Sequence, residues 1–331
     1  MNKIKPMQEQ TMEESKRTYN DLFSNVSYYI DEKLKARGIH DLILHMFREN
    51  IKNSKVLDIG CGYGRFSFLA STLSSDVLGI DMTEGAISVA NKIKKSLDNE
   101  NVKFICSSIE DFSSEEKFDF IILSGTLEHI HDEDDILKKI NYLLSEDGVF
   151  VTDSPSEFNF RGLFHASLWK LFNFPMTLSD VRIITPKGMR EMAINSGFKL
   201  DKIIGTLYKR GWGEAGASDI KSRMKNVMRS VSENMKNITI SHDNYNNWID
   251  EALDVFNPIL EDWKKNNILK EIPNIESYGF KINREYLKSE DLPSDKIEEY
   301  MAPDFSIDPY YCDSEPYNQL GGNNIYVLTK K

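Results

Sequence analysis

The sequence predicts an α/β fold, in which helices cover both faces of a doubly wound and mostly parallel sheet. Between about residues 55 and 207, short apolar runs alternate with helical stretches of roughly 10–15 residues, the rhythm of strand–helix–strand units. Several runs are apolar at successive positions, as expected of strands that are buried on both faces. The chain of 331 residues is long enough for one large domain or two small ones.

Seven segments are strand candidates, and helical patterns separate most of them. The first candidate ends in a cluster of glycines, and the second is followed by Thr83, a candidate N-cap for the next helix. Thr185 and Gly197 bound the helix that precedes the sixth candidate. The seven candidates are residues 56–59, 76–81, 102–108, 118–124, 148–152, 198–207 and 324–329.

Three stretches lie outside this alternation. Residues 1–50 are predicted to be an N-terminal helical segment, because their apolar side chains recur at helical spacing. Residues 156–184 are rich in aromatic side chains. Residues 208–322 form a large, mainly helical insertion before the last strand, with two amphipathic stripes, the second of them expected to bend at Pro258.

The composition excludes several classes of protein. Lys and Arg number 41 and Asp and Glu 52, so the formal charge is −11, and this acidity makes nucleic acid an unlikely partner. Three cysteines with no C-x-x-C pair indicate neither a disulfide framework nor the common zinc motif. The first 20 residues lack the apolar core of a secretory signal, and no run has the roughly 18 apolar residues of a membrane span. We therefore expect a cytoplasmic protein.

The sharpest motif is the run VLDIGCGYGRF over residues 56–66. Gly60, Gly62 and Gly64 follow the first strand, where glycine permits a sharp turn and lets a ligand approach the main chain. The helix that begins directly after them would offer backbone N–H groups to an anion. The spacing G-x-G-x-G, with Arg65 after it, differs from the G-x-G-x-x-G of dinucleotide-binding folds.

Acidic and polar residues follow the other strands of the predicted sheet. Asp81 ends the second strand, where a carboxylate can accept hydrogen bonds from both hydroxyls of a ribose. Its alternative role is to cap the helix at Thr83. The third strand runs into CSSIEDF (residues 106–112) and the fourth into LSGTLEHI (residues 123–130). Because the carboxyl ends of parallel strands meet at one edge of a sheet, we expect these segments to lie together.

These segments, in this order and spacing, resemble the class I S-adenosylmethionine-dependent methyltransferases. The resemblance is strongest to the small-molecule group that includes the ubiquinone-biosynthesis O-methyltransferases, and it covers about residues 50–207 and the last strand. It implies a Rossmann-like methyltransferase fold whose last strand lies antiparallel beside the sixth. It also implies S-adenosyl-L-methionine as the cofactor, with methyl transfer to a small-molecule acceptor by in-line displacement.

The resemblance assigns the methionine part of the cofactor to the glycine loop. The backbone of Gly60, Cys61 and Gly62 would face it, and Asp58 would orient its ammonium group together with the main chain of Ser124. The expected contacts at this end are therefore Asp58, Gly60, Cys61, Gly62, Gly64 and Ser124.

The resemblance assigns the adenosine part to the next two strand ends. Asp81 would hold the ribose, and Met82 would pack on the adenine. Ser108 stands where many family members have an Asp that binds the adenine amino group. Because of this departure, the N–H of Ile109 and the carboxylate of Glu110 are the expected replacements.

His129 is the candidate general base, because it lies just past the fourth strand and an unperturbed imidazole titrates near neutral pH. A base is needed only if the acceptor carries a proton that must leave. Two alternatives stay open: His129 bonds a neighbouring backbone group, or it joins Glu128, His131 and Asp132 in a metal site. Small-RNA 2′-O-methyltransferases bind a metal near here through E-x-x-E-H-x-x-H, which this sequence does not reproduce, so no metal is assigned.

The resulting division places the methyltransferase core in residues 51–207 and 323–331. Residues 156–184 and 208–322 are expected to form a cap that encloses the acceptor, and an oligomer interface is the alternative. The aromatic side chains of the cap suggest an aromatic or apolar small molecule, and a homo-oligomer remains open. The competing functions are a nicotinamide-dependent oxidoreductase and an inactive methyltransferase-like partner subunit.

Overall fold

The computed structural model describes residues 13–14, 16–17, 33–35, 38–172, 180–221, 242–272, 279–281 and 308–331. Its strands are β1 (Lys33–Lys35), β2 (Lys55–Ile59), β3 (Asp76–Asp81), β4 (Val102–Cys106), β5 (Phe118–Ser124), β6 (Leu144–Pro155), β7 (Phe198–Thr206), β8 (Lys270–Glu271), β9 (Gly279–Lys281), β10 (Tyr310–Cys312) and β11 (Asn323–Lys330). Its helices include α2 (Gly38–Met46), α3 (Arg48–Ile51), α4 (Arg65–Ala70), α5 (Glu84–Leu97), α6 (Glu133–Leu143), α7 (Phe160–Phe172), α8 (Pro186–Asn195), α9 (Tyr208–Trp212) and α11 (His242–Lys265). The short 3₁₀ turns η3 (Leu127–His129) and η5 (Tyr317–Gln319) follow β5 and precede β11, respectively.

The central sheet has the order β4-β3-β2-β5-β6-β11-β7-β10-β8. Strands β4, β3, β2, β5 and β6 are parallel, and β11 lies antiparallel between β6 and β7. All seven predicted strands are present, and the prediction that the last lies antiparallel beside the sixth is confirmed. The predicted count of seven was nevertheless too low, because β10 and β8 extend the sheet beyond β7. Strands of three and two residues are too short to show a period of two in a sequence.

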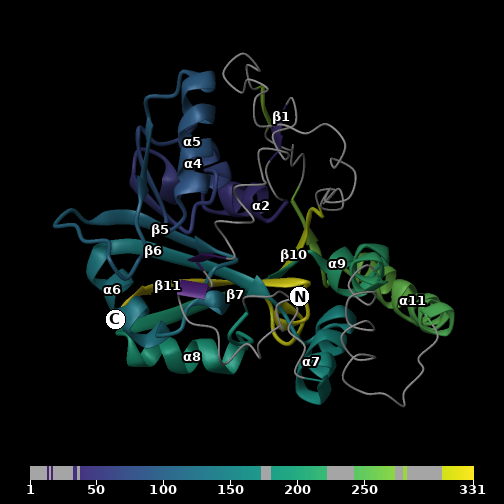
Figure 1. Ribbon diagram of the computed structural model, residues 1–331. Helices are drawn as coiled ribbons and strands as arrows, with labels where there is room; N and C mark the ends of the chain where they lie inside the picture. Colours follow the sequence, from purple (N-terminus) through teal and green to yellow (C-terminus); the bar gives the residue numbers. More distant parts are fainter. Residues whose placement is uncertain are drawn as a thin grey trace.

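Helices cover both faces of the sheet, as the sequence predicts (Figure 1). Alternate residues of each strand point to opposite faces, so Val56 and Leu57 enter different hydrophobic cores. One core packs against α2, α3, α4 and α5, and the other against α6 and α8. This doubly wound arrangement fixes the strand ends between the two helical layers.

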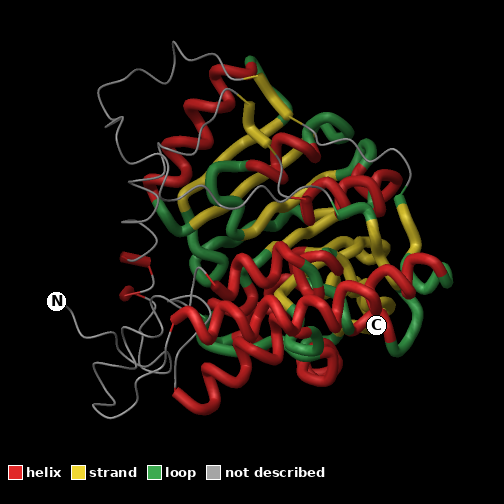
Figure 2. The backbone as a smooth tube through the Cα atoms, turned by 90° about the vertical axis from the view of Figure 1, so that its right-hand side faces the viewer, coloured by secondary structure: helices red, strands yellow, loops and turns green. Residues whose placement is uncertain are grey.

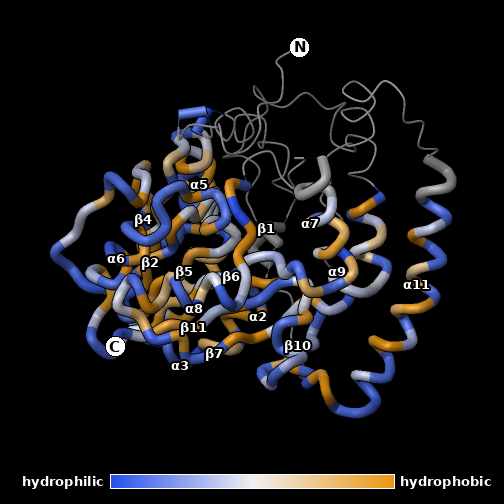
Figure 3. Tube along the Cα trace, turned by 90° about the horizontal axis from the view of Figure 1, so that it is seen from below, coloured by the Kyte–Doolittle hydropathy of each residue, from blue (hydrophilic) through white to orange (hydrophobic). Residues whose placement is uncertain are grey.

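The two insertions pack against each other beside the sheet, on the side that faces the viewer in Figure 2. Phe160 of α7 shares a buried cluster with Ile220 and with Ile249 of α11. Arg161, 1% exposed, donates to the carboxylate of Asp219 at 2.6 Å, which ties α7 to the helical residues 214–221. The helix α11 continues through Pro258 and alternates between apolar and polar positions along its length (Figure 3).

The N-terminal segment departs from its prediction. Helices occupy 38–51, but Lys33–Lys35 form the strand β1, which pairs antiparallel with β9. The prediction of an all-helical segment 1–50 is therefore wrong at β1. The helical spacing between residues 22 and 30, and most of the first stripe of the large insertion, lie outside the described residues.

The large insertion is built into the core, so we expect that replacing 208–322 with a short turn gives a protein that does not fold. The deletion removes β8 and β10, the fully buried Tyr208, and Ile272, which packs in the core of the main sheet. It also removes Asn318, whose side chain donates to the carbonyl of Ile203 in β7 at 3.1 Å. Soluble expression and circular dichroism of the deletion check this. A folded deletion would show that the insertion is an independent module.

Candidate active site

The carboxyl ends of the parallel strands form one continuous edge that collects the predicted site residues. The register places Cys106 beside Asp81, and Ser124 beside Asp153. Between these pairs, Ile59 of β2 lies next to both β3 and β5 and leads into the glycine loop. The strand order reverses between β2 and β5, and ligands of such sheets bind at this switch point.

The glycine loop between β2 and α4 has the backbone that its glycines permit. Gly60, Gly62 and Gly64 have φ values of 69°, 55° and 83°, in the left-handed region that favours glycine. A Cβ on Gly60 would lie 2.6 Å from the Oγ1 of Thr126, and that hydroxyl donates to the Ser124 carbonyl. The loop is therefore packed directly against the end of β5.

Four backbone N–H groups of this loop donate to the protein itself. The N–H groups of Gly60 and Cys61 both donate to the carbonyl of Ile80, at 2.8 and 3.0 Å. Gly62 donates to Asp81, and Gly64 donates to the Cys61 carbonyl. A loop whose amides are engaged in this way offers a ligand its carbonyl oxygens and the bare Cα atoms of glycine. Carbonyl oxygens attract a cation, so the loop suits an ammonium group better than the anion that the N-terminus of α4 suggested.

Asp58 lies beneath the loop instead of facing a ligand. Its side chain is 2% exposed, and it accepts a hydrogen bond of 2.6 Å from the Ser67 hydroxyl of α4. Asp58 thereby fixes α4 under the loop, and its role in orienting an ammonium group stays a prediction. Burial raises the pKa of Asp58 to about 7, with the Ser67 hydrogen bond opposing the shift.

We expect Asp58→Asn to stabilise the cofactor-free protein at alkaline pH. The ordinary pKa of this carboxyl is 3.8 and the folded value is about 7, so between these values the folded state holds a proton that the unfolded state has lost. Wild-type stability therefore falls as the pH rises through this window and levels off above it, a loss of about 2–4 kcal/mol. The Asn variant has no such loss and keeps an acceptor for Ser67. Urea unfolding at pH 5 and pH 8 measures the difference, and an equal difference at both values would contradict the assignment.

Asp81 connects the glycine loop to the end of β3. One carboxylate oxygen accepts the Gly62 N–H at 2.9 Å, and the other accepts the N–H and the hydroxyl of Thr83 at 2.9 and 2.6 Å. Asp81 is 9% exposed, and the oxygen that accepts Gly62 retains a lone pair for one further donor. Thr83 does occupy the N-cap position of α5, but its hydroxyl bonds Asp81 and makes no cap hydrogen bond.

The segment after β4 is a tight turn held by its own side chains. Ser108 donates to the Asp111 carboxylate at 3.0 Å and accepts the Asp111 N–H at 3.1 Å, so its hydroxyl is committed within the turn. Ile109 is buried, and the exposed Glu110 accepts Lys139 at its backbone carbonyl. Asp111, which sequence reasoning missed, is the acid that fixes this turn.

The adenine end of the predicted site is apolar and open. The half-buried Met82 lies directly after Asp81, and its carbonyl accepts a weak hydrogen bond from the thiol of Cys106 at 3.8 Å. Ile105 is 45% exposed at the edge strand β4. The backbone of the adjoining turn is tied to β3, because Ser107 donates its N–H to the carbonyl of Asp81. These surfaces lie where the resemblance expects a flat base.

A buried polar network that the sequence did not reveal surrounds Ser124. The Ser124 hydroxyl donates to the Asp153 carboxylate at 2.5 Å and lies 3.2 Å from the ring nitrogen Nε2 of His40. Asn323, at the start of β11, donates to the other Asp153 oxygen at 3.0 Å. The network joins α2 to the ends of β5, β6 and β11. The only sign of this network in the sequence was Asp153, an acidic residue directly after the predicted apolar strand 148–152.

His129 lies in η3, directly after β5, and it faces a carboxylate. Its Nδ1 is 3.2 Å from the Asp180 carboxylate, and both side chains are mostly buried. Next to this pair, the Val181 N–H donates to the Glu128 carbonyl at 2.8 Å, so the segment that carries Asp180 is held against η3. An Asp at Nδ1 holds an imidazole in one tautomer, which leaves Nε2 as the acceptor.

The suggested metal cluster does not assemble within the described ranges. Those ranges hold no group of three or more His, Cys, Asp or Glu residues placed to bind a metal ion. Glu133 pairs with Arg182, and Arg182 also donates to the His131 carbonyl at 2.7 Å. The acidic start of α6 is thus joined to the segment after Asp180.

The helices in the described part of the chain include none with the length and apolarity needed to cross a bilayer.

Comparison with known proteins gives the class of the domain. A family described as a methyltransferase domain matches residues 50–207. Over 116 residues the chain is 32% identical to a ubiquinone biosynthesis O-methyltransferase of Pelagibacter ubique, covering 35% of this chain and 48% of the relative. Over 142 residues it is 29% identical to a malonyl-[acyl-carrier protein] O-methyltransferase of Bacillus anthracis, covering 42% and 52%. The chain spans about half the length of the curated relatives it matches.

Residues 50–207 thus form a methyltransferase domain. This part of the chain is similar to the class I S-adenosylmethionine-dependent methyltransferases, and S-adenosyl-L-methionine is the cofactor expected of it. Among solved structures, the YcgJ protein of Bacillus subtilis aligns with 88% of this chain and 99% of its own, at 16% identity and a TM-score of 0.48. A similarity this distant identifies no acceptor.

The residues at the strand edge fit this cofactor. Asp81 is an acceptor fixed by three donors, which suits the hydroxyls of a ribose. The loop carbonyls suit an ammonium group, and the apolar surface at Met82 and Ile105 suits a purine. The burial of Cys61 raises the pKa of its thiol, which therefore stays neutral beside the loop.

Proposed function

We propose that the protein transfers a methyl group from S-adenosyl-L-methionine to a small-molecule acceptor by in-line displacement. The observation that carries the proposal is the hydrogen bond between the Asp81 carboxylate and the Gly62 N–H, at 2.9 Å. It joins the acid for the ribose and the loop for the methionine into one unit at the switch point of the sheet. Bound there, the cofactor supplies an electrophilic methyl group on a positively charged sulfur.

In this proposal each part of the edge has one task. The loop of Gly60, Cys61, Gly62 and Gly64, with the Ser124 main chain, holds the methionine part, and Asp58 fixes the loop from below. Asp81 holds the ribose, Met82 packs on the adenine, and Ile109 and Glu110 complete the base site beside Ser108.

His129 accepts the proton that the acceptor must lose, and Asp180 positions the imidazole of His129. Because positioning supplies much of the rate of a displacement, these side chains need to orient more than to react.

The proposal extends to the arrangement of the chain. Residues 51–207 and 323–331 form the core, and α7, α9 and α11 of the two insertions form a cap beside the acceptor side of the edge. A cytoplasmic location is part of the proposal, and the three free cysteines favour a reducing compartment.

Calorimetric titration tests the proposed function. We expect S-adenosyl-L-methionine and S-adenosylhomocysteine to bind at micromolar concentration, and NAD not to bind. Binding of NAD alone would support an oxidoreductase, and binding of neither would support an inactive partner subunit. Incubation with labelled methyl donor and a cell extract then identifies the acceptor.

A further inference from the structure

Asp153, at the end of β6, accepts hydrogen bonds at both oxygens of its buried carboxylate. The Ser124 hydroxyl donates to one oxygen at 2.5 Å, and the Asn323 amide donates to the other at 3.0 Å. The side chain is 1% exposed, and the proposed function leaves it without a task. Two donors stabilise an ionised carboxylate, so a fixed negative charge lies at this edge of the sheet.

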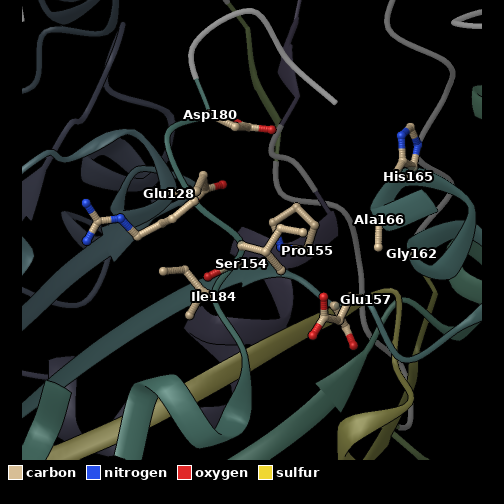
Figure 4. A pocket seen from close by; sticks show the side chains of 12 residues that line it. Glu128, Ser154, Pro155, Glu157, Gly162, His165, Ala166, Asp180 and Ile184 are labelled. Carbon is tan, nitrogen blue, oxygen red and sulfur yellow. The ribbon is translucent and has the colours of Figure 1, made fainter. Parts of the chain in front are cut away.

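This carboxylate lies on the face of the sheet that carries the glycine loop. Ser154, the next residue, lines the pocket beside β6 (Figure 4). Successive residues of a strand point to opposite faces, so Asp153 points away from that pocket. On its own face, the Nε2 of His40 is 3.2 Å from the Ser124 hydroxyl, and the His40 ring packs edge-on against Phe66 of α4, the helix that follows the loop. The charge therefore belongs to the cofactor side of the edge.

Asp153 holds the peptide between Ser124 and Gly125 at two points. Its side chain accepts the Ser124 hydroxyl, and its backbone carbonyl accepts the Gly125 N–H at 3.2 Å. The N–H and C=O of a trans peptide point in opposite directions, so the Ser124 carbonyl points away from β6 and toward β2. The Thr126 hydroxyl donates to that carbonyl at 3.0 Å and is the group that a Cβ on Gly60 would touch. The Ser124 carbonyl and the glycine loop therefore face each other across the switch point.

We infer that Asp153 is the positioning residue for the ammonium group of the cofactor. The inference rests on the proposed function for the identity of the ligand. The carbonyl oxygens of Ser124 and of the glycine loop offer the direct contacts. Asp153 acts through Ser124: it aims the Ser124 carbonyl and adds a negative charge behind it. Because this carboxylate is removed from water, its attraction for an ammonium group is screened less than that of an exposed charge.

The surroundings of Asp153 also limit the size of the effect. The guanidinium of Arg210 in α9 donates to the Asn323 side chain at 3.3 Å, and so offsets part of the charge from the far end of the network. His40, at the other end, is a further group that can carry positive charge. We therefore expect the loss of the Asp153 charge to cost no more than one charge-assisted contact.

Asp58 is the competing carboxylate, and its surroundings suit the task less well. It lies beneath the loop, where it accepts the Ser67 hydroxyl at 2.6 Å. Burial raises the pKa of Asp58 to about 7, so near neutral pH about half of this carboxyl is protonated and carries no charge. Asp153 is instead placed directly behind the Ser124 carbonyl.

Two ligands that differ by one ammonium group test the inference. S-adenosylhomocysteine carries the amino group, and its deamino analogue lacks it but keeps the carboxylate and the adenosine. In calorimetric titrations we expect Asp153→Asn to weaken binding of S-adenosylhomocysteine about tenfold, and to leave the analogue within about twofold of the wild type. An equal loss for both ligands would show that Asp153 only supports the fold, and it would overturn the inference, as would no loss for either.

Two further variants locate the effect. Ser124→Ala removes the side-chain link to Asp153 but keeps the backbone bond of Gly125, so it should weaken only S-adenosylhomocysteine, by about threefold. It carries the test if Asp153→Asn does not fold, and an equal effect on both ligands would then overturn the inference. Asp119→Asn is the matched control, because this exposed carboxylate at the opposite end of β5 also accepts a hydroxyl from β6, that of Ser145. It should change neither affinity.

The same titrations separate this inference from the proposed function. A selective loss in Asp58→Asn, with none in Asp153→Asn, would assign the ammonium to Asp58 and overturn the inference. Binding of S-adenosylhomocysteine to the wild type, without selectivity in the Asp153 variant, would overturn the inference alone and leave the proposed methyl transfer intact. No binding of either ligand to the wild type would overturn both.

Discussion

Asp81→Ala is expected to weaken binding of S-adenosyl-L-methionine by about tenfold or more, because a charge-assisted hydrogen bond to the ribose, worth roughly 1.5–3 kcal/mol, is lost. The same substitution releases the Gly62 N–H and Thr83 from their acceptor, so the loop loses its position as well as its ligand contact. Calorimetry measures the affinity, and circular dichroism establishes that the fold survives.

Two further variants make this result specific. Asp81→Asn keeps an oxygen for Gly62 but loses the charge, so we expect an affinity between those of the wild type and the Ala variant. Asp76→Asn changes an exposed carboxylate at the opposite end of the same strand, where it pairs with Lys55, and should leave cofactor binding unchanged. Equal affinity of all three variants would refute the role of Asp81 at the ribose.

The sequence predicted the cofactor edge well because its signals are local. A strand that runs into Gly60, Gly62 and Gly64 has few backbone solutions, and Asp81 must lie at the end of its own strand. The antiparallel last strand beside the sixth also followed, from the family resemblance. The sequence did not show which acceptor the N–H groups of the loop would bind, because the carbonyl of Ile80 and a ligand would both lie at the same edge of the sheet.

The acceptor side could not be predicted, because it is assembled from segments that are far apart in the chain. Asp180 contacts His129, which lies 51 positions earlier in the chain, and Asn323 contacts Asp153 across a much longer interval. No periodic pattern encodes such contacts. Aromatic residues of the insertions suggested a greasy acceptor, but several of them pack among themselves, as Trp212 does with Trp263.

His129→Asn is expected to lower turnover by about 10²–10⁴, the usual contribution of a general base, while S-adenosyl-L-methionine affinity stays the same. Asn can still donate to Asp180, so the contact at 3.2 Å has a replacement and the segment should stay in place. Asp180→Asn should give a smaller loss, because the imidazole remains but is no longer held by a carboxylate. The assay uses the acceptor identified with labelled methyl donor, under single-turnover conditions.

The neighbouring His131→Asn is the control for this series, because the contact of His131 with Arg182 uses its backbone carbonyl and not its ring. We expect its turnover to equal that of the wild type, and we expect a chelator to leave wild-type turnover unchanged. A His129 variant that loses thermal stability and cofactor affinity together would show that His129 only supports the fold. Turnover that vanishes with chelator and returns with Mg²⁺ would instead assign Glu128, His129 and their neighbours to a metal, and the general-base role of His129 would then be withdrawn.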